Sequence, residues 1–132
     1  MKPSITLLFI IITLGCKKEK IHAIQSRIIG KWELSRRWGT IAGIDENFPA
    51  GNGAILEFSG NNFYQYSNTQ LTQTGTYTIV EDTTSFTVHG KRITFNGNSS
   101  IDYEKFAMIT DTTLTIRDYW ADAESNQYRR LQ

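Results

Sequence analysis

The residue types that could carry out chemistry are few and scattered in this chain. Its single cysteine is Cys16, and its two histidines are His22 and His89. Nucleophilic catalysis needs a base placed beside a reactive group. His89 lies next to Gly90 in an expected tight turn, where a solvent-exposed histidine is far commoner than a catalytic one. We therefore predict that the chain is not an enzyme.

The acidic residues do not have the spacing of a metal site. They fall mostly at expected strand ends and loops: Asp45, Glu46, Asp82, Asp111, Asp118, Asp122 and Glu124. A calcium loop needs oxygen ligands at alternating positions around a glycine turn, and these acids lack that spacing. With no second cysteine, neither a thiolate zinc site nor a disulfide is predicted. Gly51-Asn52-Gly53 lacks the lysine and helix of a phosphate-binding loop. We expect no metal and no cofactor.

The length and net charge of the chain limit its domain number and the kinds of partner that it attracts. The chain has 132 residues and a formal net charge of +1, which allows one domain with a buried core. A near-neutral chain has no strong electrostatic attraction to nucleic acid, so no nucleic-acid partner is expected.

The N-terminal segment has the pattern of a secretory signal peptide. Lys2 precedes an apolar run from Ile5 to Leu14, Cys16 follows Gly15, and residues 17–20 are polar. A helix needs about 20 apolar residues to cross the bilayer core, so this run is too short to span it. A basic start, a short apolar run and a small residue before the break predict a signal peptide over residues 1–15.

The remaining chain must position any site, and its pattern is that of β-strands. Only the stretch Ile21–Ile29 favours a helical turn. From Gly30 onward apolar and polar residues alternate, and Gly, Asn, Asp and Ser mark the turns. The longest connection is a loop from Gly39 to Gly53, and a loop of that length is often functional. The expected strands cover residues 32–38, 56–58, 63–67, 71–80, 86–88, 93–95, 101–110, 114–119 and 126–131.

Eight or nine short strands joined by brief turns must be antiparallel neighbours, because no helix is available for a parallel crossover. Closing such a meander into an up-and-down barrel removes its exposed edges. We therefore predict an all-β, single-domain antiparallel barrel. A β-sandwich is the alternative, although its Greek key usually needs longer crossing connections.

Alternation along the strands predicts which side chains point into the barrel. The inward set includes Arg36, Trp38, Phe58, Tyr77, Phe106 and Met108. An inward Arg36 needs a partner. That partner is either an internal acid such as Glu104 or Asp118, or an anionic ligand head group. The alternation around Tyr64 and Tyr66 does not decide their direction. Facing outward with Tyr119 and Trp120, they would form an aromatic patch suited to a protein or glycan.

The N-terminal segment also resembles the signal of bacterial lipoproteins, in which the cysteine is freed by cleavage, acylated and anchored in the bilayer. Leu14 and Gly15 fit that signal, whereas Thr13 stands where leucine is usual. The resemblance implies lipid attachment at Cys16, followed by a tether to residue 27. A cleaved signal with a coincidental cysteine is the alternative.

The domain over residues 28–132 resembles the lipocalins, and most closely the short bacterial lipocalin-like lipoproteins. Gly30-Lys31-Trp32 matches the Gly-x-Trp that opens their barrel, and Tyr128-Arg129-Arg130 supplies the arginine that stacks on that tryptophan. Three further segments match in order: Leu56-Glu57-Phe58, Gly75-Thr76-Tyr77-Thr78-Ile79 and Thr113-Leu114-Thr115-Ile116. The later motifs and the helix of longer lipocalins are not found. The resemblance implies that Gly30, Trp32 and Arg130 close the barrel.

Function and location are expected from these resemblances. They imply an envelope-anchored lipoprotein that binds a small apolar or amphipathic molecule at the barrel mouth, under a lid formed by Gly39–Gly53. The alternative is a solid-cored barrel that acts as a protein-interaction or inhibitor module. Lys17 stands where an aspartate would resemble an inner-membrane retention signal, so the outer membrane is favoured.

Overall fold

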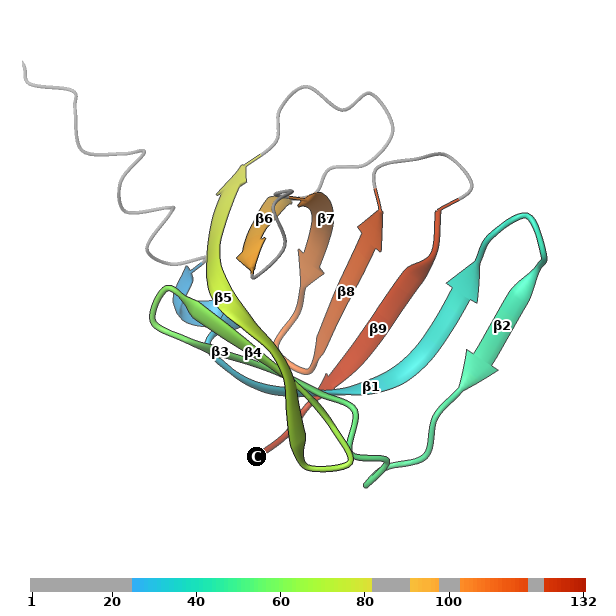
Figure 1. Cartoon of the computed structure of the whole chain (residues 1–132). Coiled ribbons are helices and arrows are strands. Elements are labelled where there is room, and N and C mark those ends of the chain that lie inside the picture. Colours follow the sequence, from blue (N-terminus) through green and yellow to red (C-terminus); the bar gives the residue numbers. More distant parts are fainter. Residues whose placement is uncertain (1–24, 82–90, 98–102, 119–122) are drawn as a thin grey trace, which may run out of the picture.

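The computed structural model describes residues 25–81, 91–97, 103–118 and 123–132 of the chain. Apart from one helical turn, the regular structure of this part is all β-strand (Figure 1). The strands are β1 (Gly30–Gly39), β2 (Ile44–Asn47), β3 (Ile55–Ser59), β4 (Asn62–Ser67), β5 (Gln70–Glu81), β6 (Lys91–Gly97), β7 (Tyr103–Ile109), β8 (Thr113–Asp118) and β9 (Ser125–Arg130).

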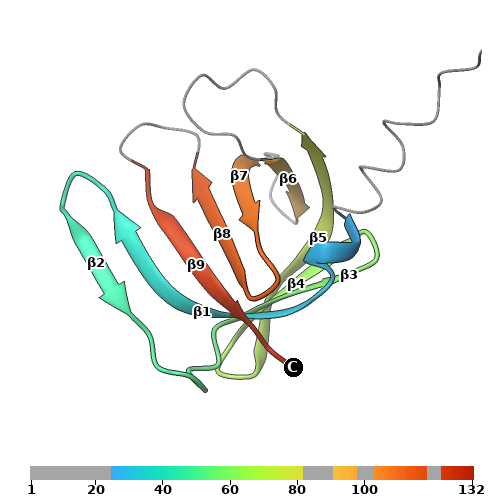
Figure 2. The ribbon, with the colours of Figure 1, turned by 180° about the vertical axis from the view of Figure 1, so that it is seen from behind.

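Eight of these strands form a closed barrel. From β3 to β9 each strand pairs antiparallel with the next, and β1 pairs with both β3 and β9, which closes the sheet. The views from the front and from behind show the same cup-shaped arrangement (Figures 1 and 2). The predicted all-β antiparallel barrel is therefore confirmed, and the pairing of β1 with β9 removes the two edges that an open eight-stranded meander would expose.

The segment expected to be one long loop is organised differently. It contains β2, which pairs with the second half of β1, whereas β3 pairs with the first half. The β1–β2 hairpin consequently projects from one side of the barrel (Figure 1). The expectation of an unstructured connection over Gly39–Gly53 is corrected by this ninth strand.

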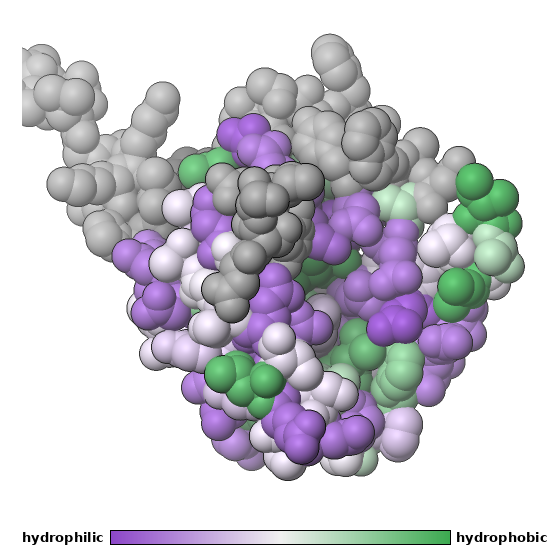
Figure 3. All heavy atoms as spheres, viewed as in Figure 1, coloured by the Kyte–Doolittle hydropathy of each residue, from purple (hydrophilic) through white to green (hydrophobic). Residues whose placement is uncertain are grey.

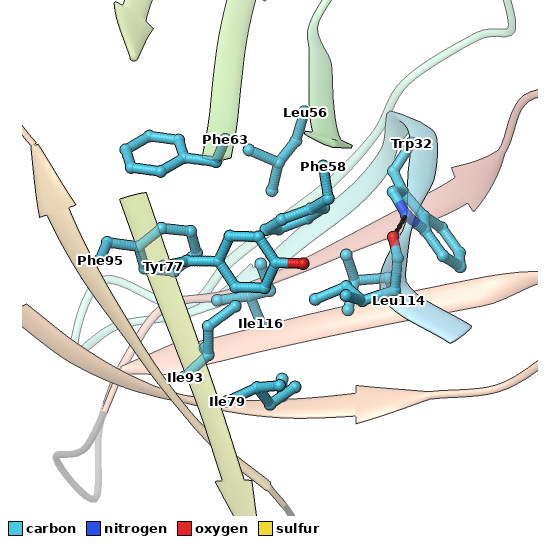
Figure 4. Close-up of a cluster of buried hydrophobic side chains, with 12 residues drawn as sticks. Trp32, Leu56, Phe58, Phe63, Tyr77, Ile79, Ile93, Phe95, Leu114 and Ile116 are labelled. Atoms are coloured by element: carbon cyan, nitrogen blue, oxygen red, sulfur yellow. Dashed lines mark hydrogen bonds between the residues drawn. The ribbon is translucent and has the colours of Figure 1, made fainter. Parts of the chain in front are cut away.

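One end of the barrel is filled by a packed core (Figure 4). Its aromatic rings meet edge to face, with centroids 4.8 Å apart for Phe58 and Tyr77 and 5.0 Å apart for Phe63 and Phe95. The Phe63 ring lies against Gly75, where an added Cβ would come within 2.9 Å of it. We call this the closed end. The buried cluster comprises Ile28, Trp32, Leu56, Phe58, Phe63, Tyr77, Ile79, Ile93, Phe95, Ala107, Leu114 and Ile116.

A helical turn over residues 25–28 covers the closed end. Trp32 is fully buried, and its Nε1 donates to Ile28 O at 2.7 Å. The Arg130 guanidinium lies 4.1 Å from the centre of the Trp32 ring and donates to the carbonyls of Arg27 and Ile29. Gly30 has a φ of 127°, and a Cβ there would approach Arg130 Nη1 to 3.2 Å. The structure thus brings together the three residues that the sequence predicted to close the barrel.

A β-bulge interrupts β1 and changes which of its side chains point inward. The pairing with β9 shifts between Leu34 and Arg36, so Ser35 is an extra residue in β1. Because side chains alternate with a period of two, one extra residue moves every later side chain to the other face. From this point Arg37, rather than Arg36, shares the inward face with Asn126.

Several sequence-based predictions fall outside the described residues. They concern Cys16, the signal peptide and tether, the strand expected over residues 86–88, the turn at His89-Gly90, and the pair Tyr119 and Trp120.

Candidate functional site

The inward side chains of several strands change from apolar to polar toward the same end of the barrel. On β8 the inward series runs from Leu114 through Ile116 to Asp118, and on β7 it runs from Ala107 to Lys105. Three other strands show the same change: Phe63 to Gln65 on β4, Tyr128 to Asn126 on β9, and Leu34 to Arg37 on β1. We call this polar end, opposite the helical turn, the open end.

A cavity of about 390 Å³ occupies the barrel interior toward the open end. In Figure 3 hydrophobic atoms lie deep at the centre of the molecule, with hydrophilic atoms around them. Five of the described lining residues are apolar or aromatic, and four are polar or charged. They are Leu56, Phe63, Phe95, Ile116 and Tyr128, and then Gln65, Lys105, Asp118 and Asn126.

A lysine and an aspartate meet in the polar part of the cavity. Lys105 and Asp118 are register partners on β7 and β8, and Lys105 Nζ lies 2.5 Å from Asp118 Oδ1. Their side chains are 24% and 38% exposed, so the pair is partly withdrawn from water. The two opposite charges compensate each other inside the barrel.

A second polar group lies at the rim of the open end. Arg37 Nε donates to Asn126 Oδ1 at 3.3 Å and lies 3.4 Å from Glu124 Oε1. Asn126 Nδ2 donates to the same Glu124 oxygen at 3.0 Å, and Glu46 on β2 is 4.0 Å from Arg37 Nη1. The guanidinium also lies 5.6 Å from the centre of the Phe48 ring. These contacts hold a cation and two carboxylates around one side of the cavity entrance.

Two of the predicted ligand-binding residues lie in the packed core instead of on the cavity wall. Phe58 is 1% exposed and Tyr77 is 2% exposed, and their rings contact each other. The Tyr77 hydroxyl donates to Gly60 O at 2.9 Å. Burial disfavours the phenolate and raises the pKa of Tyr77 to about 12. Both residues are placed to stabilise the closed end.

Arg36 and Trp38 face away from the interior, which corrects the inward prediction. The Ser35 bulge is the physical reason, because the prediction continued the alternation of Trp32 and Leu34 without interruption.

The two outward residues form a surface cluster with a third. Arg36 makes a bidentate contact with Asp45 on β2, at 2.9 and 2.8 Å, and lies 5.1 Å from the centre of the Trp38 ring. The hydrogen bond from Arg36 lowers the pKa of Asp45 and raises the pKa of the arginine. Neither of the expected partners of Arg36, Glu104 and Asp118, is the residue that it contacts.

Phe106 and Met108 also face the outside of the barrel. Ala107 between them belongs to the core, Ile109 packs against it, and Lys105 lines the cavity, so these three residues of β7 point inward. Met108 is 43% exposed, whereas Phe106 is buried although it shares the outward face. The inward prediction for both is corrected, because the phase of β7 is set by its pairing with β6 and β8.

The segment before β3 packs on the barrel wall and does not form a lid. Asn52 Nδ2 donates to Leu34 O at 2.8 Å, and the backbone N–H of Gly51 donates to Glu33 Oε2 at 3.1 Å. Arg129 Nη2 donates to Phe48 O at 2.6 Å, and its buried Nε lies 3.3 Å from Glu33 Oε2. Among the described residues that line the cavity, none comes from Gly39–Gly53, so the expected lid is corrected.

Sequence reasoning missed the polar residues of the cavity. The alternation left the direction of Tyr64 and Tyr66 open, and the structure places Phe63 and Gln65 inside. Asp118 was considered only as a partner for Arg36. A usable signal was present in Lys105, which alternates with the small Ala107 and lies opposite an acid once β7 and β8 are paired.

In comparisons with protein-family models, curated proteins and solved structures, nothing matches this chain. Within the described ranges no helix has the length and hydropathy needed to span a membrane. The same part of the chain brings together no group of three His, Cys, Asp or Glu residues that could hold a metal.

Proposed function

We propose that the barrel binds a small amphipathic molecule in the cavity of its open end. The observation that carries this proposal is a cavity with an apolar floor and a polar rim in which opposite charges are already paired. Its volume of about 390 Å³ is within the ~300–1,000 Å³ of small-molecule sites. The apolar part of the ligand would contact Phe63, Phe95 and Ile116, and its polar head would reach Lys105 and Asp118.

The character of the rim restricts the head group. Lys105 is a hydrogen-bond donor and Asp118 an acceptor, so a head group with both functions matches the pair better than a bare alkyl end does. A long lipid chain does not suit a cavity of this size, whereas a molecule of one or two rings does.

We also propose that the chain is a lipocalin-like lipoprotein of the bacterial envelope, held at the membrane by acyl chains on Cys16. The closed eight-stranded barrel and the stacked Trp32–Arg130 pair support a lipocalin-like fold. The apolar run ending before Cys16 supports the anchor. Acyl chains contribute roughly 0.8 kcal/mol for each buried CH₂, and more than one chain gives stable attachment.

A protein-interaction module is the second candidate, and one observation favours it. Tyr64 and Tyr66 face outward on β4, as the patch hypothesis required. A shallow apolar hollow of about 200 Å³ lies beside them. It is lined by Lys31, Ile55, Tyr66 and Thr69. Nearby Leu71 is 54% exposed.

A matched pair of substitutions on β4 tests ligand binding. Gln65→Trp would fill the cavity, because Gln65 lines it, whereas Tyr64→Trp places the same side chain on the outside of the same strand. The probe is anilinonaphthalene sulfonate, whose fluorescence rises when its rings enter an apolar site. We expect saturable binding to the parent and to Tyr64→Trp, and loss of binding in Gln65→Trp. Equal binding by all three proteins would show that the dye binds outside the cavity and would contradict the proposed binding site.

The anchor is tested separately in cells. Cys16→Ser should release the protein from the membrane fraction, whereas Lys17→Ser should leave it bound. Membrane association that survives Cys16→Ser would refute lipid attachment at that residue.

A further inference from the structure

The β1–β2 hairpin ends in an uncharged tip at the open end of the barrel. From Trp38 to Ile44 no charged residue occurs, and Ile41 in the turn is 94% exposed. That fraction is well above the values for Leu71 (54%) and Met108 (43%). The folded chain thus holds a branched aliphatic side chain almost fully in water.

The hairpin projects from the barrel. Beyond its pairing with β1, β2 has no other strand partner in the described part of the chain, and its turn lies at the far end of β1 from the helical turn (Figure 1). Hydrophobic atoms are visible at this projecting end in Figure 3. Such a tip can enter an apolar environment outside the protein without any movement of the barrel strands.

The charges nearest the tip are already paired. Arg36 contacts Asp45 at 2.8 Å, and Arg37 lies 4.0 Å from Glu46 and 3.4 Å from Glu124. Trp38 lies between these pairs and the turn, and its ring contacts Arg36. An aromatic ring between an apolar tip and a charged base suits the boundary of a bilayer, where tryptophan is enriched.

The occupant that fits this tip is a lipid surface. A stable protein interface buries about 800 Å² on each partner, whereas the convex turn presents one large aliphatic side chain. The proposed lipid attachment at Cys16 would hold the chain close to such a surface. Cys16 and Gln25 are nine positions apart, which spans at most about 30 Å when extended. A strand of ten residues such as β1 is about 33 Å long, so a chain held at Cys16 can bring the far end of β1 to the same bilayer.

We propose that the β1–β2 hairpin inserts Ile41 into the bilayer to which the chain is tethered, with Trp38 at the headgroup level. This inference rests on the proposed attachment at Cys16. Because the neighbouring charges are paired, the contact is with the apolar part of a zwitterionic bilayer and is insensitive to salt. The insertion would fix the orientation of the barrel and of its open end relative to the membrane.

The test uses a chemical tether, so it does not depend on acylation in cells. The full chain, prepared with its single thiol free, is coupled through Cys16 to a maleimide lipid in phosphatidylcholine vesicles. Two variants, Ile41→Trp and Leu71→Trp, each add one tryptophan at an exposed turn region, at the β1–β2 and β4–β5 hairpins. Fluorescence is then compared between vesicles with ordinary and with brominated phosphatidylcholine.

We expect the tryptophan added in Ile41→Trp to be quenched at low and at high salt, and the one added in Leu71→Trp to be unaffected. Absence of additional quenching in Ile41→Trp, or equal quenching in the two variants, would overturn the proposal. A tip that contacts a protein partner instead would also show no quenching. The vesicle experiment uses neither acylation in cells nor the dye. If Cys16 is not acylated in cells, or if the dye does not bind, those results therefore contradict only the proposed function.

Discussion

The two ends of the barrel use the same strands for different purposes. At the closed end Trp32, Tyr77 and Leu114 are buried, and a helical turn covers them. At the open end the inward positions of the same sheet carry Lys105 and Asp118 around a cavity. The packed core and the polar rim thus occupy different segments of the same strands, and Phe63, Phe95 and Ile116 belong to both the core and the cavity wall.

The energetic contrast follows from burial. A fully buried large apolar side chain contributes roughly 2 kcal/mol to stability, and the closed end contains most of these. A partly exposed ion pair such as Lys105–Asp118 contributes about 0–1 kcal/mol. The barrel should therefore tolerate substitutions at the open end that it does not tolerate at the closed end.

Removing the tryptophan of the closed end should have the largest effect. Trp32→Ala leaves a cavity and removes both the bond to Ile28 and the Arg130 stack, and should lower the free energy of unfolding by about 4 kcal/mol. Trp38→Ala is the matched control, because Trp38 lies on the outer wall, and should cost less than about 1 kcal/mol. Urea denaturation measures both. A larger loss for Trp38→Ala would invert the comparison.

A buried ion pair on the wall should give the next largest effect. Glu33→Ala removes the carboxylate that faces Arg129 and that accepts from the backbone N–H of Gly51. The Glu33 side chain is only 3% exposed. Because Arg129 is one-third exposed, water partly compensates, and we expect a loss of about 2 kcal/mol. Lys31→Ala removes an exposed pair with Glu57 on the same wall and is the control. Equal losses in chemical denaturation would show that burial of Glu33 does not matter.

Alkaline pH should destabilise the closed end through one hydroxyl. The pKa of Tyr77 is raised by burial to about 12 from its ordinary 10.0, so the folded state binds the proton more tightly. The resulting stability is complete below pH 10 and is lost as pH rises through about 12. Tyr77→Phe should lack this loss when unfolding is followed across that range. The same pH dependence in both proteins would exclude Tyr77 as its source.

The smallest effect on stability is expected at the open end. Lys105→Met removes one partner of the cavity pair and should change stability by less than about 1 kcal/mol. It should nevertheless weaken binding of the anionic dye about fivefold, which corresponds to about 1 kcal/mol. Arg92→Met breaks the outward pair with Glu104 and should leave dye binding unchanged. Weaker binding in Arg92→Met alone would move the site to the outer wall.

The sequence predicted the architecture more closely than it predicted the site. Alternation and short turns were sufficient for the closed barrel, and Gly30, Trp32 and Arg130 meet as expected. The positions of the site residues depend on strand pairing, which the alternation of apolar and polar residues does not predict. The bulge at Ser35 arises in the pairing of β1 with β9, which are far apart in sequence.

Two further features required the three-dimensional pairing. The inward phase of β7 was assigned from its hydrophobic residues, and Phe106 and Met108 are hydrophobic on the outer side. The Lys105–Asp118 contact is a consequence of register between two strands. A one-residue difference in either case moves a side chain from the cavity to the solvent.

The most direct test of binding at the open end is an amide NMR titration of the full chain with anilinonaphthalene sulfonate. Saturable shifts should concentrate at Gln65, Lys105 and Asn126, while the amide of Trp32 at the closed end and that of Leu71 on the outside stay unchanged. Shifts that centre on Tyr64, Tyr66 and Leu71, or no saturable shift at all, would contradict ligand binding in the cavity.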